Sequence, residues 1–161
     1  MIILGIDPGT TAIGYALLDN QRFSPRLLAA DLISISAVER TERLRELHQG
    51  LNKILKRWRP DVVAVERLFF SRNQKTALEV AEAKGVILLT TTLAGVKSYE
   101  YTPLEIKRGV TGDGSADKKQ IKKMLGLILP GEDLARYQDD ILDAVAIALY
   151  CSQNTRPGAL S

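Results

Sequence analysis

The first 36 residues contain three stretches whose apolar positions are typical of β-strands. Residues 2–6 form an apolar run, broken only by Gly5, that ends at Asp7 and a Pro-Gly pair. This predicts a buried strand with Asp7 at its end. Residues 11–18 and 26–36 carry further apolar positions on either side of a turn. Short turns join the three stretches, so together they predict an antiparallel meander.

The pattern then changes to a helical period. Between residues 41 and 59, apolar side chains recur every three or four residues, which predicts a long amphipathic helix. Residues 61–66 return to an apolar run that ends at Glu66. A strand, helix, strand connection predicts that this strand is parallel to an earlier one. If it neighbours the first strand, Asp7 and Glu66 lie side by side at the carboxyl edge of the sheet, where α/β sheets bind ligands.

The remainder of the chain completes an α/β domain. Its pattern predicts a strand at residues 97–101 and helices at 75–93, 104–108, 118–129 and 139–151. A Gly-rich polar loop precedes the helix at 118–129, with Ser115 or Asp117 as its N-cap. The predicted fold is a five-stranded mixed sheet, three antiparallel strands and then parallel strands, flanked by helices. We expect one domain over residues 1–151 and a flexible tail over residues 152–161.

The last predicted helix opens with acidic residues. Asp140 and Asp143 are three residues apart, so they share one face near the helix start. The helix dipole alone favours acids in a first turn, which is a sufficient explanation for Asp139 and Asp140. It explains Asp143 less well, because that residue lies among apolar residues, where a lone charge is costly.

Three apolar elements therefore each present a carboxylate. A turn cap explains Asp7 alone and a salt bridge to Arg67 explains Glu66 alone, but one acidic centre explains them together. Carboxylates without histidine or cysteine favour magnesium or manganese over zinc. Two such ions, about 3.5–4 Å apart, hold the attacking and leaving oxygens of a phosphodiester displacement. The candidate catalytic acids, which are also the candidate ligands of two Mg²⁺ or Mn²⁺ ions, are Asp7, Glu66, Asp143 and either Asp139 or Asp140.

The composition narrows the function classes. The single cysteine, Cys151, excludes an intrachain disulfide and a cysteine zinc cluster. The single histidine, His48, would have to supply any Ser-His-Asp triad, and we place it on the outer face of the long helix as a surface residue. The net charge of +3 permits acidic partners. No apolar run reaches membrane-spanning length and no signal-peptide pattern is present, so we expect a cytoplasmic protein without membrane association.

Four stretches carry a resemblance to a known family: GIDPGTTAIGYALL, RPDVVAVERLFFSRN, KRGVTGDGSADKKQI and DDILDAVAIALY. In their order and spacing, the chain resembles the bacterial Holliday junction resolvases of the RuvC type, within the ribonuclease H-like superfamily. The resemblance covers nearly the whole chain. It implies that Asp7, Glu66, Asp140 and Asp143 match the family's four catalytic acids, and it selects Asp140 over Asp139.

The resemblance also implies partners. The family acts as a homodimer that binds four-way junction DNA and nicks two opposing strands symmetrically, during recombination and repair. It works beside the RuvA–RuvB branch-migration machinery. The predicted helix at residues 75–93 is rich in Ala and Leu, so it is a candidate dimer interface, with burial inside the monomer as the alternative.

Candidate DNA contacts come from an aromatic motif and a basic stretch. Phe69 matches a family aromatic that stacks on an unpaired base, with core or interface packing as the alternative, which we favour for Phe70. Asn73 either bonds DNA or caps the next helix. A solvated helix face is the default explanation for the basic stretch, but Lys107 and Lys118 match basic residues that the family uses near its active site. The predicted contacts are Phe69, Arg72, Asn73, Lys75, Lys107, Arg108, Lys118, Lys119 and Lys122, and Lys84 is a further candidate.

Other functions share some of these features. A ribonuclease H-like nuclease that acts on RNA would carry the same acids. A non-catalytic junction-binding module is expected when one of the four acids is missing, and all four are present. The DPGT turn also occurs in actin-like kinases, which normally need two such domains and a longer chain.

Overall fold

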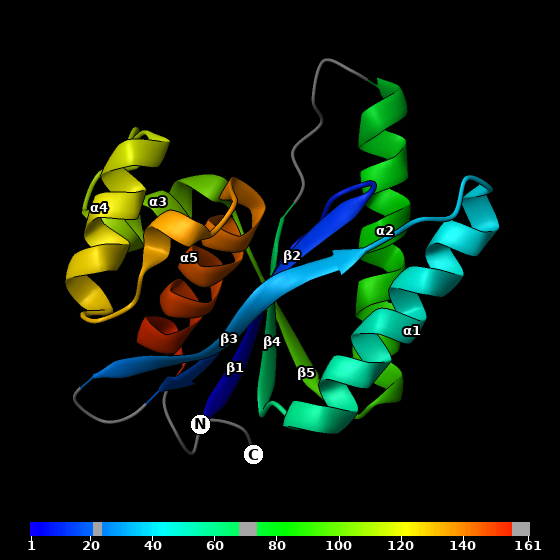
Figure 1. Cartoon of the computed structure of the whole chain (residues 1–161), viewed down its shortest axis with the longest axis horizontal. Coiled ribbons are helices and arrows are strands. Elements are labelled where there is room, and N and C mark those ends of the chain that lie inside the picture. The colour runs from blue at the N-terminus through cyan, green and yellow to red at the C-terminus, as the bar shows by residue number, and fades with distance from the viewer. Residues whose placement is uncertain (21–23, 68–73, 156–161) are drawn as a thin grey trace.

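A computed structural model describes residues 1–20, 24–67 and 74–155, without the side chains of residues 74–76 (Figure 1). Its centre is a five-stranded sheet in the order β3-β2-β1-β4-β5. The strands are β1 (Ile2–Asp7), β2 (Ala12–Asn20), β3 (Pro25–Ser34), β4 (Val62–Glu66) and β5 (Lys97–Tyr101). The first three strands are antiparallel, and β4 and β5 run parallel to β1. The predicted mixed sheet is therefore confirmed, including β4 as the neighbour of β1.

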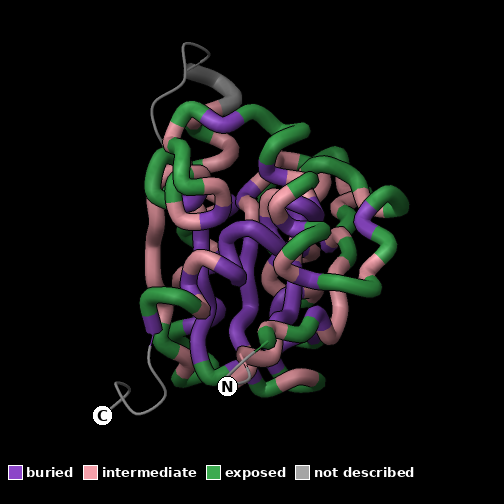
Figure 2. Tube along the Cα trace, turned by 90° about the vertical axis from the view of Figure 1, so that its left-hand side faces the viewer, coloured by how far each residue is buried: buried purple, intermediate pink, exposed green. Residues whose placement is uncertain are grey.

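Helices cover both faces of the sheet, as Figure 1 shows. One layer contains α1 (Arg40–Trp58) and α2 (Gln74–Leu93), and the other contains α3 (Pro103–Thr111), α4 (Lys118–Ile128) and α5 (Asp139–Asn154). A short 3₁₀ helix, η1 (Leu134–Arg136), was not predicted. Buried strand residues run through the middle of the molecule in Figure 2, between the more exposed outer helices.

The alternation of side chains along β1 assigns the two faces. Leu4 and Ile6 belong to the buried cluster that contains Leu47 and Leu51 of α1. Ile3 belongs to the other cluster, which contains most of α5. Because successive strand residues point to opposite faces, Asp7 lies on the same face as Ile3, toward α5.

Two helices extend beyond their predicted bounds. In α3, the N-cap Thr102 and Glu105 form a capping box, and Gly112 ends the helix in the left-handed conformation, with φ 82°. Helix α5 continues to Asn154, and Thr155 is buried, so the ordered part of the chain reaches beyond Cys151. Residues 156–161 of the expected tail lie outside the described residues. Among the described residues, no helix is long and apolar enough to cross a membrane.

Candidate active site

Asp7 and Glu66 end neighbouring parallel strands. Ile6 of β1 pairs with Val65 of β4, so the next residue on each strand is an acid. Val62 and Ala64 pack with α5 residues in one cluster, which places Glu66 on the same face as Asp7 by strand alternation. The side-by-side arrangement that the sequence predicted therefore follows from the observed register.

Two glycines let α5 approach this part of the sheet closely. A Cβ added to Gly5 would lie 2.3 Å from the carbonyl oxygen of Ala144, and one added to Gly14 would lie 1.9 Å from that of Asp140. Gly14 is also the register partner of Asp7. The start of α5 is therefore held directly against the strand pair that ends in Asp7, which brings Asp140 and Asp143 to the same place.

The electrostatics show that the four acids share one environment. Burial raises the pKa of Asp7 to about 8, with further contributions from Glu66, Asp143 and Asp140. Burial also raises the pKa of Glu66, and the charge of Asp143 adds to this effect. The pKa of Asp143 is raised by burial first. Asp7 and Glu66 have no hydrogen-bond or ion-pair partner among the described side chains.

Asp139 differs from Asp7 and Glu66 because it forms a close ion pair with Lys118. The Lys118 ammonium donates a hydrogen bond of 2.8 Å to Asp139 Oδ2 and lies 3.9 Å from Asp143 Oδ2. The Asp139 side chain is 64% exposed, and the hydrogen bond from Lys118 lowers its pKa. Asp139 is therefore solvated and paired, whereas Asp7 and Glu66 are partly buried and free of such partners within the described residues.

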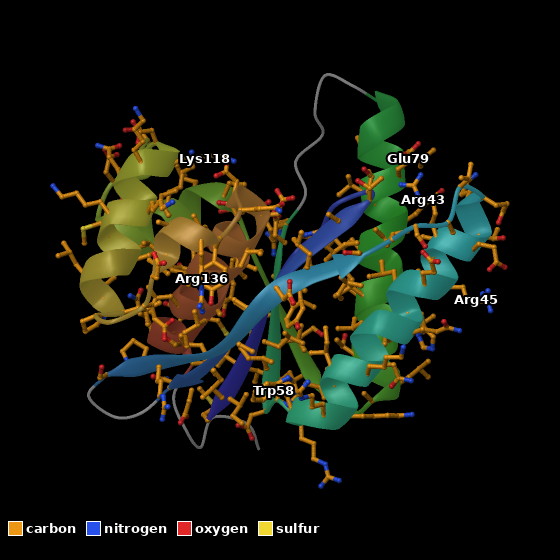
Figure 3. The ribbon with its side chains drawn as sticks, in the orientation of Figure 1. Arg43, Arg45, Trp58, Glu79, Lys118 and Arg136 are labelled. Atoms are coloured by element: carbon orange, nitrogen blue, oxygen red, sulfur yellow. The ribbon has the colours of Figure 1, made fainter. Side chains whose placement is uncertain are left out.

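The basic residues beside the acids come from α3 and α4. The net pKa of each of these acids is raised by burial, and the lysine charges offset part of that rise. Lys107 does so for Glu66 and Asp143, and Lys118 does so for Asp7. Lys118, Lys119 and Lys122 line a small cavity of about 110 Å³ that Asp139 and Asp143 also line. Lys118 is the first residue of α4, and Figure 3 shows it at one end of that helix. Arg108 is exposed on α3.

Several predicted residues cannot be placed in this site. Phe69, Phe70, Arg72 and Asn73 lie outside the described residues, and the side chain of Lys75 does so as well. Lys84 forms an ion pair with Glu100 and is only 13% exposed, so it does not extend an open basic surface.

The interpretation of His48 was wrong, and the alternative explanation of Glu66 as a salt-bridge partner of Arg67 does not apply. His48 is half-buried rather than a surface residue, and its Nδ1 lies 2.9 Å from Thr90 Oγ1, because α2 packs beside this part of α1. Glu66 forms no ion pair with Arg67 in the described part of the chain. Instead, the Arg67 amide donates to the Tyr101 carbonyl, which continues the β4–β5 pairing.

The chemistry of the donor set fits a hard divalent cation. Among the described residues, no group of three or more His, Cys, Asp or Glu could hold a metal ion as the side chains stand. Like charges repel at such a site, and Lys118 lies beside Asp143. The available donors are carboxylates from β1, β4 and α5, and these are the ligands that Mg²⁺ and Mn²⁺ prefer.

The sequence analysis missed the groups that hold this site in shape. Gly5 and Gly14 were not singled out, although glycine inside a strand is a signal for close backbone approach. Arg43 of α1 was also missed. Its guanidinium donates a hydrogen bond to the carbonyl of Thr10, in the turn that follows Asp7. A long side chain at the border of a helix's apolar face is only a weak signal for such a contact.

Comparisons with known proteins agree with this geometry. Residues 3–151 match the family model described as crossover junction endodeoxyribonuclease RuvC. The chain is 43% identical to the RuvC of Moorella thermoacetica, covering 92% of this chain and 89% of the relative. It is 39% identical to that of Caldanaerobacter subterraneus, covering 96% and 94%.

Solved structures give the same result. A structure described as T. thermophilus RuvC in complex with Holliday junction substrate matches with a TM-score of 0.86 and 36% identity, over 93% of this chain and 92% of that one. The yeast mitochondrial Holliday junction resolvase Ydc2 matches with a TM-score of 0.72 at 14% identity, which shows a shared fold. The expected ribonuclease H-like α/β class is thereby confirmed.

Proposed function

This chain belongs to the RuvC family of crossover junction endodeoxyribonucleases, and we propose that it resolves four-way DNA junctions with Asp7, Glu66, Asp140 and Asp143 as its catalytic acids. The observation that carries the proposal is the convergence of these acids at one sheet edge, where each of Glu66, Asp143 and Asp140 contributes to the raised pKa of Asp7. The relative from T. thermophilus binds a Holliday junction, and the same substrate class is proposed here.

The metal ions are proposed to be Mg²⁺ or Mn²⁺, two for each site. Asp7 and Glu66 would hold them from the strand ends, and Asp140 and Asp143 from the helix. When bound, the ions orient and activate a water molecule and neutralise charge on the leaving oxygen. The rigid strand and helix ends fix the carboxylates, while Lys107 and Lys118 keep their charge partly balanced when DNA is absent.

The DNA surface is proposed to surround the acids on the side of α3 and α4. Lys118 and Lys119 occupy the first turn of α4, where the helix dipole disfavours cations but favours a bound phosphate. Lys107, Arg108 and Lys122 extend this basic surface. Phe69, Arg72, Asn73 and Lys75 are further proposed contacts, with Phe69 stacking on an unpaired base.

Helix α2 is proposed as the surface through which two copies of the chain associate. Leu78 and Leu89 are 61% and 60% exposed, which is unusual for leucines on one helix. Leu78, Gly85 and Leu89 follow each other at steps of seven and four residues, so they share a face. Gly85 has open space around its Cα, which leaves room for a close partner helix.

A symmetric dimer would present two acidic centres, as symmetric paired nicks in opposing strands require. Replacing Leu89 with Glu should convert the protein to monomers in analytical ultracentrifugation. Leu127→Glu is the matched control, because Leu127 of α4 is 67% exposed and lies away from α2. A dimer that survives Leu89→Glu would exclude this face.

We also propose that the protein works in the cytoplasm and associates with the RuvA–RuvB machinery.

The proposed activity is tested by incubating the protein with a synthetic four-way junction and with a linear duplex of the same sequence. Paired nicks should appear in the junction alone with Mg²⁺ or Mn²⁺ and disappear in a chelator. Glu66→Gln should lose cleavage but retain junction binding, whereas Glu132→Gln, in a loop away from the site, should retain both. Binding without cleavage in either metal would favour a non-catalytic module, and cleavage of duplex or RNA at the same rate would refute the structural selectivity.

A further inference from the structure

A second cavity of the described residues lies far from the acids. It has a volume of about 540 Å³ and is formed between the ends of α1 and α2. Pro60, directly before β4, and Val96, directly before β5, line it. It therefore opens at the amino end of the parallel strands, the edge opposite to Asp7 and Glu66. In Figure 3 this is the end of α1 that carries Trp58.

One wall of the cavity is cationic. Lys56, Arg59 and His48 line it, and no acidic residue does. The sequence contains no Asp or Glu between Glu46 and Asp61. Asp61 itself accepts a hydrogen bond of 2.6 Å from the amide of Ile2. Within the described part of the chain, Lys56 and Arg59 thus have no acidic partner.

His48 adds a directed polar atom to this wall. The Thr90 hydroxyl donates a hydrogen bond of 2.7 Å to the carbonyl of Val86, so its oxygen acts as the acceptor for His48 Nδ1, 2.9 Å away. The proton on Nδ1 leaves Nε2 as the available ring atom. In the neutral ring Nε2 accepts a hydrogen bond, and only in the protonated ring does it donate one.

Arg59 occupies a position that glycine would favour. It ends α1 with φ 45° and ψ 58°, and it is the one non-glycine residue with positive φ among those described. A left-handed helix cap is normally glycine, and an arginine there costs free energy. The helix dipole favours a cation at this end of α1, as it does for Lys56 in the last turn. From this cap position Arg59 also lines the cavity.

The remaining wall is apolar. Leu55, Leu93 and Val96 line it, and Leu93 is largely exposed. The cavity thus combines cations on one side with an apolar pocket wide enough for a side chain. A DNA backbone carries phosphates but no apolar group to fill this pocket, whereas a peptide carries both an apolar side chain and carboxylates.

We propose that this cavity binds a short acidic segment of a partner protein, in which an apolar side chain enters between Leu55, Leu93 and Val96. The flanking carboxylates of that segment would contact Lys56 and Arg59. Because the cavity and the acids lie at opposite edges of the sheet, the segment and a DNA junction would bind together. The site would hold the nuclease on a protein assembly without covering its active site.

A library of random 12-residue peptides displayed on phage tests this proposal with the full chain as bait. Selected peptides should combine Leu, Ile or Phe with two or more Asp or Glu. A synthetic copy of the best peptide should bind Lys56→Glu and Arg59→Gly about tenfold more weakly than the wild type, which corresponds to the loss of one charged hydrogen bond. The control Lys53→Glu changes an exposed α1 lysine that does not line the cavity, and it should bind normally.

Arg59→Gly separates binding from folding. Glycine suits the left-handed cap, so this variant should melt at the same temperature as the wild type or higher while it loses the peptide. Junction cleavage should be unchanged, and added junction DNA should not displace the peptide. Three binding results would overturn the proposal: selected peptides without added Asp or Glu, equal peptide affinity of Lys56→Glu and the wild type, or displacement of the peptide by DNA. Loss of the dimer in either variant would also overturn it, because a second copy of the chain would then be the occupant.

Discussion

Gly14 lies so close to Asp140 that a single added methyl group would collide with the backbone of α5. The Cβ of an alanine at this position would be 1.9 Å from the Asp140 carbonyl oxygen. The contact joins the strand partner of Asp7 to the first turn of the helix that carries Asp140 and Asp143. The spacing of the acidic centre therefore depends on the absence of a side chain.

Gly14→Ala should move the start of α5 away from the sheet. We expect a loss of about 1–3 kcal/mol in the free energy of unfolding, which is typical of overpacking, and a larger relative loss of cleavage. Gly126→Ala is the matched control, because Gly126 is a helical glycine in α4 with open space around it. That variant should gain about 0.5–1 kcal/mol from helix propensity and retain activity. Urea unfolding and junction cleavage measure both effects, and full activity in Gly14→Ala would refute the close-contact argument.

The free energy of unfolding of the metal-free protein should fall as the pH rises, because of Asp7. Its pKa is about 8 in the folded state, well above the value of about 3.9 in an unfolded chain. The folded protein then retains a proton that the unfolded chain has lost, so stability falls with rising pH between about 4 and 8. In a chelator, Asp7→Asn should be more stable than the wild type at pH 8, by on the order of 2 kcal/mol or roughly 4–8 °C in Tm. The two proteins should converge toward pH 4. A difference that does not change with pH would contradict this explanation.

Metal binding should release protons from the same carboxyl groups. Burial and like charge raise the pKa of Asp7, Glu66 and Asp143, and a metal ligand must be deprotonated. Titration calorimetry with Mn²⁺ at pH 6.5, in two buffers of different ionisation enthalpy, measures the number of protons released. We expect a positive number that falls toward zero above pH 8. Asp7→Asn should release fewer protons, and equal heats in the two buffers would show that the acids are already ionised.

Asp139 and Asp140 should respond differently to the same substitution. Asp139 is exposed and paired with Lys118, whereas Asp140 follows it on the turn that Gly14 contacts. Asp139→Asn should retain cleavage within about tenfold of the wild type, because it removes a surface ion pair. Asp140→Asn should lower the cleavage rate by at least about 100-fold, as expected for the loss of a metal ligand. Single-turnover cleavage of a bound junction compares them directly, and equal losses would make Asp139 a part of the centre.

Arg43 should support the turn that follows Asp7. Its guanidinium bonds the Thr10 carbonyl, and Figure 3 shows it beside Glu79, between α1 and α2. Arg43→Met should lower cleavage several-fold and reduce stability by about 1–2 kcal/mol, because the carbonyl loses a charged donor. Arg45→Met provides the control, since Arg45 forms an exposed ion pair with Glu42 on the same helix. Equal activity of the two variants would exclude a role for Arg43.

The sequence predicts the strands and the placement of the acids well because both depend on local patterns. The apolar runs before Asp7 and Glu66 define buried strands, and the long helix between them requires a parallel crossover. The contacts that set the spacing of the site depend on tertiary packing instead. The close approach of Gly14 to the Asp140 carbonyl depends on how α5 packs on the sheet. The hydrogen bond from Arg43 to the Thr10 carbonyl depends in the same way on the position of α1. His48 illustrates the same limit, because its burial depends on α2, which no periodicity within α1 reveals.

The central claim is that carboxylates from β1, β4 and α5 form one metal centre, and anomalous diffraction tests it most directly. Crystals of the protein soaked in Mn²⁺ should show anomalous density between the strand ends and α5, with Asp7 and carboxylates from β4 and α5 about 2.0–2.4 Å from the ion. Glu66→Gln should weaken or remove that density, and Glu132→Gln should leave it unchanged. Density absent from this edge of the sheet, or confined to Asp139, would contradict the account.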